Sequence, residues 1–99
     1  MGFKDVRTSV IEKLKSGDIQ HEARGSIDVK NLMSTGQVST DEVIEYLKVC
    51  RGDQYSTMKH KDDNSVDVHV FKPVVEKVEW YIKCYVLEPD VWFISVHES

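Results

Sequence analysis

The spacing of apolar residues changes once along this chain, near Gly52, and this change limits the possible folds more than any other feature. Before it, apolar side chains recur every three or four residues, as on one face of an α-helix. After it, they alternate with polar side chains, as in strands that bury one side. This order predicts an α+β fold in which about three N-terminal helices pack on an antiparallel meander of about four strands.

The first predicted helix covers residues 3–16. Its apolar positions fall four residues apart, and charged side chains occupy the opposite side. Gly17 follows directly, at a position where helices often end in a left-handed residue. The apolar stripe of this helix consists of Val6, Val10 and Leu14.

Two further helices are expected before Gly52. Residues 28–34 form the second, which ends near Gly36. The third follows Ser39, because this serine and Glu42 three residues later have the spacing of a capping box. The polar stretch 18–26 has no clear pattern and is left unassigned.

Four segments after Gly52 have the alternation of strands, separated by the turn-forming stretches "DDNS" and "EPD". They are residues 54–61, 66–72, 78–87 and 91–98. With 99 residues and no linker or repeat, the chain is expected to be a single domain over residues 1–99.

Composition excludes several classes of protein. Apolar residues make up 40% and charged residues 30%, which is typical of a globular domain. No apolar stretch is long enough for a membrane helix or a signal peptide, so a cytoplasmic protein without membrane contact is expected. In such a protein, Cys50 and Cys84 are expected to be buried, reduced thiols. The net charge of −4 argues against extensive phosphate binding, although a local basic patch remains compatible with it.

Alternation also predicts which strand residues face the helices, because successive side chains point to opposite sides of a sheet. Met58, Val68, Val70, Trp92 and Ile94 are expected in the core. The opposite face is expected to collect Lys59, Asp67, His69, Phe71, Tyr81, Lys83, Tyr85, Phe93, Ser95 and His97.

Such a face has two interpretations. Aromatic rings can stack on the bases of a single strand, cations can bind phosphates, and His and Tyr can exchange protons with a 2′-hydroxyl. The simpler interpretation is that any sheet packed on one side has a polar, solvated face. No compact metal-ligand spacing, glycine-rich phosphate loop or Ser/His/Asp pattern is present, so neither a metal nor a cofactor is expected.

Several short motifs resemble the MqsR family of toxins. They are "QYSTM", "DVHVFKP", "WYIKCYV" and the C-terminal "ISVHES", and the preceding helix order is also similar over roughly residues 4–99. The resemblance implies a fold like that of the RelE and YoeB toxins. It also implies an mRNA endoribonuclease of a toxin–antitoxin module. A broader group of small domains with an early His-x-x-Arg, here His21 and Arg24, is similar as well.

Carried over by position, the resemblance is uneven. Tyr81 and Lys83 fall on the family's Tyr and Lys, and Tyr81 matches its catalytic Tyr. Ser56 falls where the family has a catalytic Lys, whose role is lost or passes to Lys59. Val68 replaces a catalytic Gln, for which His69 or Asp67 is a substitute. His97 replaces the C-terminal catalytic Lys, and an imidazole can act as acid or base near neutral pH.

The first hypothesis is therefore a metal-independent ribonuclease acting on single-stranded mRNA, neutralised by an antitoxin protein. Its catalytic residues would be Tyr81, His97 and His69, and its RNA-binding residues Lys59, Lys72, Lys83 and Ser56. The second is a non-catalytic binding or adaptor domain on the same scaffold. The third is a structural subunit with a dimer patch formed by Tyr55, Phe71, Tyr85 and Phe93.

Overall fold

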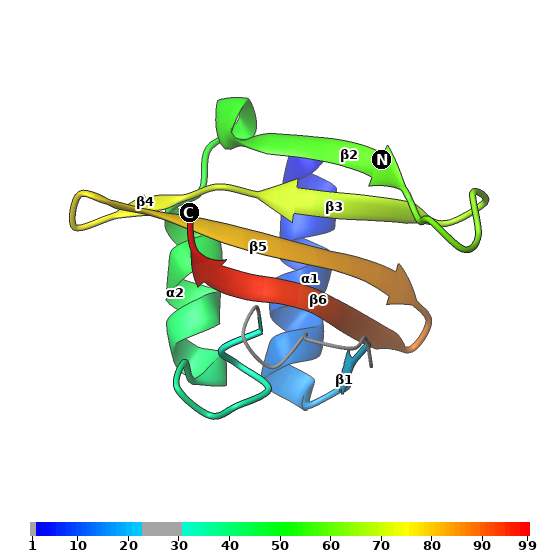
Figure 1. Cartoon of the computed structure of the whole chain (residues 1–99), viewed down its shortest axis with the longest axis horizontal. Helices are drawn as coiled ribbons and strands as arrows, with labels where there is room; N and C mark the ends of the chain where they lie inside the picture. Colours follow the sequence, from blue (N-terminus) through cyan, green and yellow to red (C-terminus); the bar gives the residue numbers. More distant parts are fainter. Residues whose placement is uncertain (1, 23–30) are drawn as a thin grey trace.

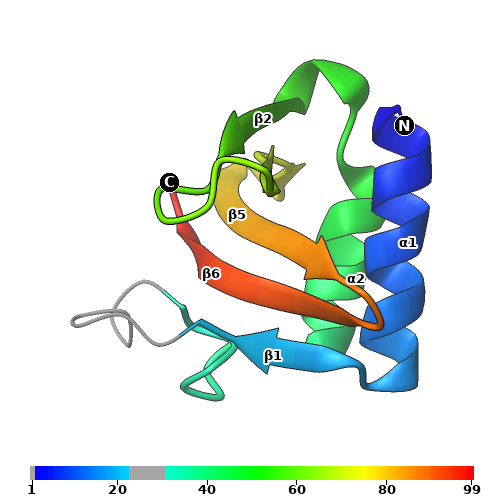
Figure 2. The same ribbon diagram turned by 90° about the vertical axis from the view of Figure 1, so that its right-hand side faces the viewer.

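The computed structural model describes residues 2–22 and 31–99. Two α-helices in these ranges cover one face of a six-stranded sheet, so the fold is α+β with two layers (Figures 1 and 2). The face of the sheet turned away from the helices is called the outer face below. No helix in the described ranges is both long and apolar enough to cross a membrane.

Helix α1 spans Phe3–Ser16, as the apolar spacing predicts. Its stripe residues Val6, Val10 and Leu14 are buried against the sheet. Gly17 ends the helix with a φ of 82°, and its N–H donates to the carbonyl of Lys13. A left-handed residue at this position is most easily supplied by glycine, which has no Cβ to clash with the backbone.

Helix α2 spans Thr40–Val49 and begins with the predicted capping box. The hydroxyl of Ser39 accepts from the N–H of Glu42 at 3.1 Å, and the Glu42 carboxylate accepts from the N–H of Ser39 at 3.0 Å. The helix expected over residues 28–34 is not found where the chain is described. Residues 28–30 lie outside the described ranges, and residues 31–37 form a β-bridge followed by turns.

The sheet has the order β1-β6-β5-β3-β2. Its antiparallel part corresponds to the four predicted strands, which are β2 Tyr55–Lys59, β3 Asp67–Phe71, β5 Val78–Leu87 and β6 Asp90–Glu98. The prediction of a meander is therefore confirmed for these strands, whose ends differ from the predicted ends by at most two residues. A short 3-10 helix, Gly52–Gln54, leads into β2.

Two short strands were not predicted. Strand β1, Ile19–His21, pairs in parallel with β6 and lies in the stretch left unassigned. Strand β4, Val74–Val75, forms a hairpin with the start of β5, and its turn residues Glu76 and Lys77 both have positive φ. Three residues or fewer show no measurable alternation, which is why periodicity misses strands of this length.

The predicted faces of β2 and β3 are reversed. Phe71 pairs with Ile82 and His69 with Cys84, and these partners lie in the core beneath the helices. Paired residues share a face, so Asp67, His69 and Phe71 point to the helix side and Val68 and Val70 to the outer face. The same pairing places Lys59 on the helix side and the exposed Met58 on the outer face.

The predicted faces of the first half of β6 are also reversed, and a β-bulge in this strand explains why. Lys83 pairs with Ser95 and Cys84 with Phe93, which leaves Ile94 without a partner on β5. The extra residue changes the phase of alternation. Before the bulge, Val91 and Phe93 face the helices and Trp92 faces outward; after it, Val96 faces the helices and His97 outward.

Each side of the sheet carries an apolar cluster. The larger cluster joins both helices to the sheet. The smaller one, on the outer face, contains Val68, Tyr85 and Ile94 and packs against Val66 and Trp92. Phe71, Phe93 and Tyr85 are all buried, so the expected aromatic dimer patch is not a surface.

Candidate functional site

Tyr81 and His97 lie opposite each other on neighbouring strands of the outer face. They are paired residues of β5 and β6, and their rings stack with centroids 5.3 Å apart and planes inclined by 26°. Both side chains are half-buried. The sequence-based placement of these two residues on one open surface is confirmed.

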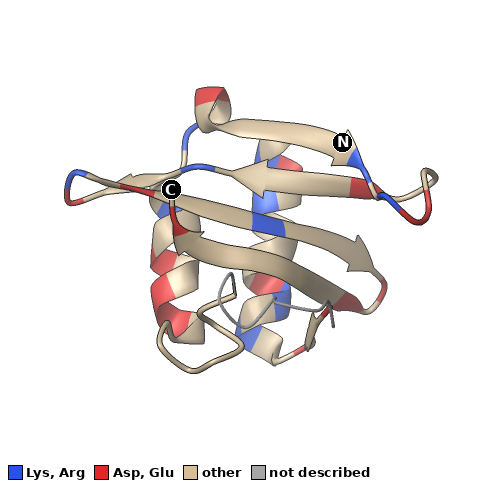
Figure 3. Cartoon of the chain, viewed as in Figure 1, with Lys and Arg blue, Asp and Glu red and all other residues tan. Residues whose placement is uncertain are grey.

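Two lysines flank this pair. The Nζ of Lys72 lies 5.9 Å from the centre of the Tyr81 ring, and Lys83 comes two residues after Tyr81 on the same face. Ser95 is the cross-strand partner of Lys83. We call Tyr81, His97, Lys72, Lys83 and Ser95 the outer site. Figure 3 shows a blue segment in the middle of β5, while the acidic segments of the sheet lie at the ends of its strands and in its loops, and others lie on the helices.

The hydrogen bond of His97 defines the state of its ring. Nδ1 lies 2.7 Å from the carbonyl oxygen of Glu98. A carbonyl only accepts hydrogen bonds, so Nδ1 carries a proton and donates it. In the neutral ring Nε2 then has a free lone pair and can accept a proton, which is the requirement for a general base.

His69 and Lys59 do not belong to the outer site, because they lie on the other side of the sheet. His69 Nδ1 is 2.8 Å from the hydroxyl of Tyr55, and burial lowers the pKa of His69, an effect partly offset by the Asp67 carboxylate. Lys59 forms an ion pair with Asp67 at 2.7 Å. His69, Tyr55 and Asp67 line a cavity of about 540 Å³ that also reaches Val6 of α1.

Ser56 does lie on the outer face, since it pairs with Val70, which in turn pairs with Lys83. It is exposed, two strands away from Lys83. Lys59 cannot take over a role at this position, because the sheet separates the two side chains. Of the two alternatives for the family's first lysine, the pairing of β2 and β3 therefore favours the loss of its role over its transfer to Lys59.

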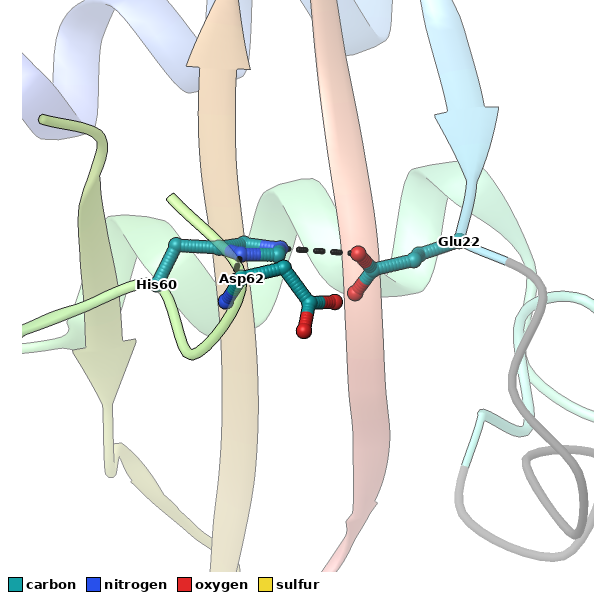
Figure 4. Close-up of side chains that lie close together, drawn as sticks. All are labelled: Glu22, His60 and Asp62. Carbon is teal, nitrogen blue, oxygen red and sulfur yellow. Dashed lines mark hydrogen bonds and ion pairs between the residues drawn. The ribbon is translucent and has the colours of Figure 1, made fainter. Parts of the chain in front are cut away.

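A group that the sequence did not reveal lies at the other end of the outer face, where Glu22, His60 and Asp62 meet (Figure 4). His60 is buried in the β2–β3 loop, and its Nε2 is 2.8 Å from the carboxylate of Glu22, next to β1. The Tyr85 hydroxyl donates to the same oxygen at 3.3 Å. Because 38 residues separate Glu22 from His60, no local motif indicates this contact.

The three residues offer ligand-type atoms within 4.8 Å of one another. However, Nδ1 of His60 accepts the backbone N–H of Asp62 at 3.1 Å. The neutral ring therefore carries its proton on Nε2 and donates it to Glu22. A histidine nitrogen must be unprotonated to bind a metal, so this arrangement is a hydrogen-bonded link between the β2–β3 loop and β1.

No protein-family model matches the chain, and no curated protein matches it.

Proposed function

We propose that the chain is an endoribonuclease that cleaves single-stranded RNA at the outer site without a metal. The observation that carries this proposal is the stacked pair of Tyr81 and His97 between two lysines. An acid and a base on adjacent strands, with cations beside them, are the groups needed to transfer a phosphodiester to its own 2′-hydroxyl.

His97 acts as the base in this mechanism. Its Nε2 takes the proton of the 2′-hydroxyl, and the 2′-oxygen attacks the neighbouring phosphorus. The bond from phosphorus to the 5′-oxygen breaks, and the Tyr81 hydroxyl donates its proton to that oxygen. The products are a 2′,3′-cyclic phosphate and a 5′-hydroxyl. Lys72 and Lys83 stabilise the negative charge that builds up on the phosphate oxygens.

The sequence resemblance supports the same residues. Tyr81 and Lys83 match site residues of the MqsR family, and His97 stands where the family has its C-terminal catalytic Lys; all three share the outer face. A toxin of this class would be an mRNA interferase. We propose that an antitoxin protein neutralises it by covering the outer site. His69 and Lys59 have no part in this mechanism, since they lie on the helix side.

The test is incubation of the purified chain with a long single-stranded RNA in EDTA, with the cut ends mapped by primer extension. His97→Ala and Tyr81→Phe should each slow cleavage by about 10²- to 10⁴-fold. His69→Ala is the matched control, because it removes a half-buried imidazole from the opposite side of the sheet and should leave the cut pattern unchanged. Cuts that persist in His97→Ala at the original rate would exclude this mechanism.

A second candidate is a non-catalytic binding or adaptor domain. Ser56 favours it, because a small hydroxyl occupies the position of a family lysine and no other side chain of β2 replaces that charge on the outer face. The net charge of −4 also favours this candidate, because it argues against extensive binding to the phosphates of RNA. This candidate predicts RNA or protein binding without cleavage, and expression in a bacterium without growth arrest.

A further inference from the structure

A second pair of stacked aromatic rings lies on the outer face, farther along the same two strands as the outer site. Tyr85 on β5 is the cross-strand partner of Trp92 on β6. Their ring planes are inclined by only 6°, and the centroids are 6.1 Å apart. In Figure 1 this face is turned toward the viewer, with β5 and β6 side by side in front of the helices.

The two aromatic pairs are separated by Lys83 and its partner Ser95. Tyr85 follows Tyr81 by four residues, which corresponds to about 13 Å along β5. Stacked bases of one nucleic-acid strand advance about 3.4 Å each, and unstacked bases advance more, so at most about four nucleotides span this distance. A single strand cut at the outer site can therefore reach the second aromatic pair within a few nucleotides and pass the cation of Lys83 on the way.

Tyr85 is held in place by contacts on the outer face. It is buried, and its hydroxyl donates to the carboxylate of Glu22 at 3.3 Å. The ring of His60 meets the Tyr85 ring at 82°, with centroids 5.0 Å apart, and Figure 4 shows the bond between His60 and Glu22 in front of β5 and β6. Because Tyr85 is fixed and stacks on Trp92, the indole is oriented before any ligand binds, which lowers the entropy lost on binding.

Trp92 differs in exposure from the other tryptophan of the chain. Trp80 lies on the helix side, stacks on Tyr46 and is 9% exposed. Trp92 packs against the outer cluster but is only half-buried. The uncovered part of its ring is an aromatic surface on which a nucleobase can stack, and such stacking accepts every base because each has a π-face.

We propose that Trp92 is the stacking platform for one base of the RNA strand that is cut at the outer site, with Lys83 binding a phosphate in between. The inference rests on the proposed function and places this base within about four nucleotides of the scissile phosphate. Trp92 binds the substrate and takes no part in proton transfer. Its loss should therefore raise the KM for RNA and leave kcat unchanged.

The first experiment measures cleavage kinetics of the whole chain on single-stranded RNA. Trp92→Leu keeps an apolar side chain against Val68 and Ile94 but has no ring, and it should raise KM about 5- to 100-fold at unchanged kcat. Trp92→Phe retains a ring and should recover most of the affinity. Trp80→Phe is the matched control on the helix side and should leave KM unchanged.

The position of the stacked base is tested with substrates that lack one base. Single abasic nucleotides are placed in turn at each of about four positions on either side of the cut. At one position the missing base should raise the KM of the unaltered chain and have no effect in Trp92→Leu, because both changes remove the same contact.

A binding experiment separates the platform from the cleavage reaction. A 2′-O-methylated oligonucleotide of about 12 nucleotides has no free 2′-hydroxyl and cannot be cut by the proposed mechanism. In Trp80→Phe the fluorescence comes from Trp92 alone, and the oligonucleotide should quench it saturably. In Trp92→Leu only Trp80 fluoresces, and its emission should not change.

The outcomes distinguish the two proposals. Quenching of Trp92 without cleavage of unmodified RNA would exclude the nuclease and leave the base-stacking role of Trp92. Cleavage with the same KM in Trp92→Leu as in the unaltered chain would exclude the platform and leave the nuclease. The absence of quenching up to about 1 mM oligonucleotide would overturn the inference whether or not RNA is cut.

Discussion

Asn31 is a polar residue inside the core that joins three parts of the chain. Its side chain is fully buried, its amide group lies 3.0 Å from Nδ1 of His21 and 3.4 Å from the carbonyl of Phe93, and its oxygen accepts the N–H of Ser34. Every polar atom of the side chain is thus bonded without water. A buried polar group of this kind stabilises the fold only while its partners stay in place.

Asn31→Ala is therefore expected to lower the free energy of unfolding by about 2 kcal/mol, because it leaves a buried carbonyl, a ring nitrogen and an N–H without their partner. Urea denaturation followed by circular dichroism measures this difference. Asn64→Ala removes an exposed amide from the β2–β3 loop and should change stability by less than about 0.5 kcal/mol. Equal effects of the two substitutions would contradict the role assigned to Asn31.

Cys84 is the second residue with a specific expectation. It lies on β5 and is completely buried on the helix side of the sheet, and this burial raises the pKa of its thiol to about 12. Only the thiolate reacts with alkylating reagents, so Cys84 should resist iodoacetamide in the folded protein at pH 8 and react after denaturation. Mass spectrometry of the labelled chain measures this. Rapid labelling of Cys84 in the native state would show that the core opens locally.

At the scale of single elements, the start of α2 offers a clean test. The reciprocal bonds between Ser39 and Glu42 satisfy two N–H groups that the first turn of a helix cannot bond itself. Ser39→Ala should cost about 1 kcal/mol of unfolding free energy. Ser34→Ala is the matched control, since Ser34 is exposed and the contact it makes to Asn31 uses its backbone. A similar loss in both variants would argue against the capping box as the cause.

The elements also show how far the sequence predicts this structure. Helix α1 and the start of α2 follow from local rules, because apolar spacing and capping residues act within one or two turns. The strands exist where alternation places them, yet half of their faces are reversed. In β3 both sides are buried, by helices on one side and by the outer cluster on the other, so Val68 and Phe71 are equally apolar and alternation cannot decide between them.

The candidate site is predictable to a similar degree. Tyr81, Lys83, Ser95 and His97 were placed on one face correctly, because the pairing of β5 and β6 after the bulge restores the simple alternation. His69 and Lys59 were placed there wrongly, together with their whole strands. The link between Glu22 and His60 depends on long-range packing, for which a single sequence contains no local signal.

At the scale of the whole molecule, two histidines make stability depend on pH. Burial lowers the pKa of both His21 and His69 below the usual value. The unfolded chain therefore binds protons more readily than the folded one. This contribution to stability is fully present above the unfolded pKa of about 6.5 and is lost as the pH falls below it.

Thermal unfolding between pH 7.5 and pH 5 should therefore show a falling midpoint. The double variant His21→Gln with His69→Gln should have a flatter profile over this window, because neither glutamine gains a proton. Carboxylates with lowered pKa values, such as Asp67, should contribute only at more acidic pH. A wild-type midpoint that stays constant down to pH 5 would contradict this expectation.

The bulge at Ile94 divides β6 into two halves whose side chains have different surroundings. The half before it contributes Val91 and Phe93 to the core. The half after it turns Ser95, which is buried, and the half-buried His97 to the outer face. Deleting that one residue would exchange the inward and outward side chains of one half relative to the other. The bulge thus lets one continuous strand pack the core with its first half and place His97 on the outer face with its second half.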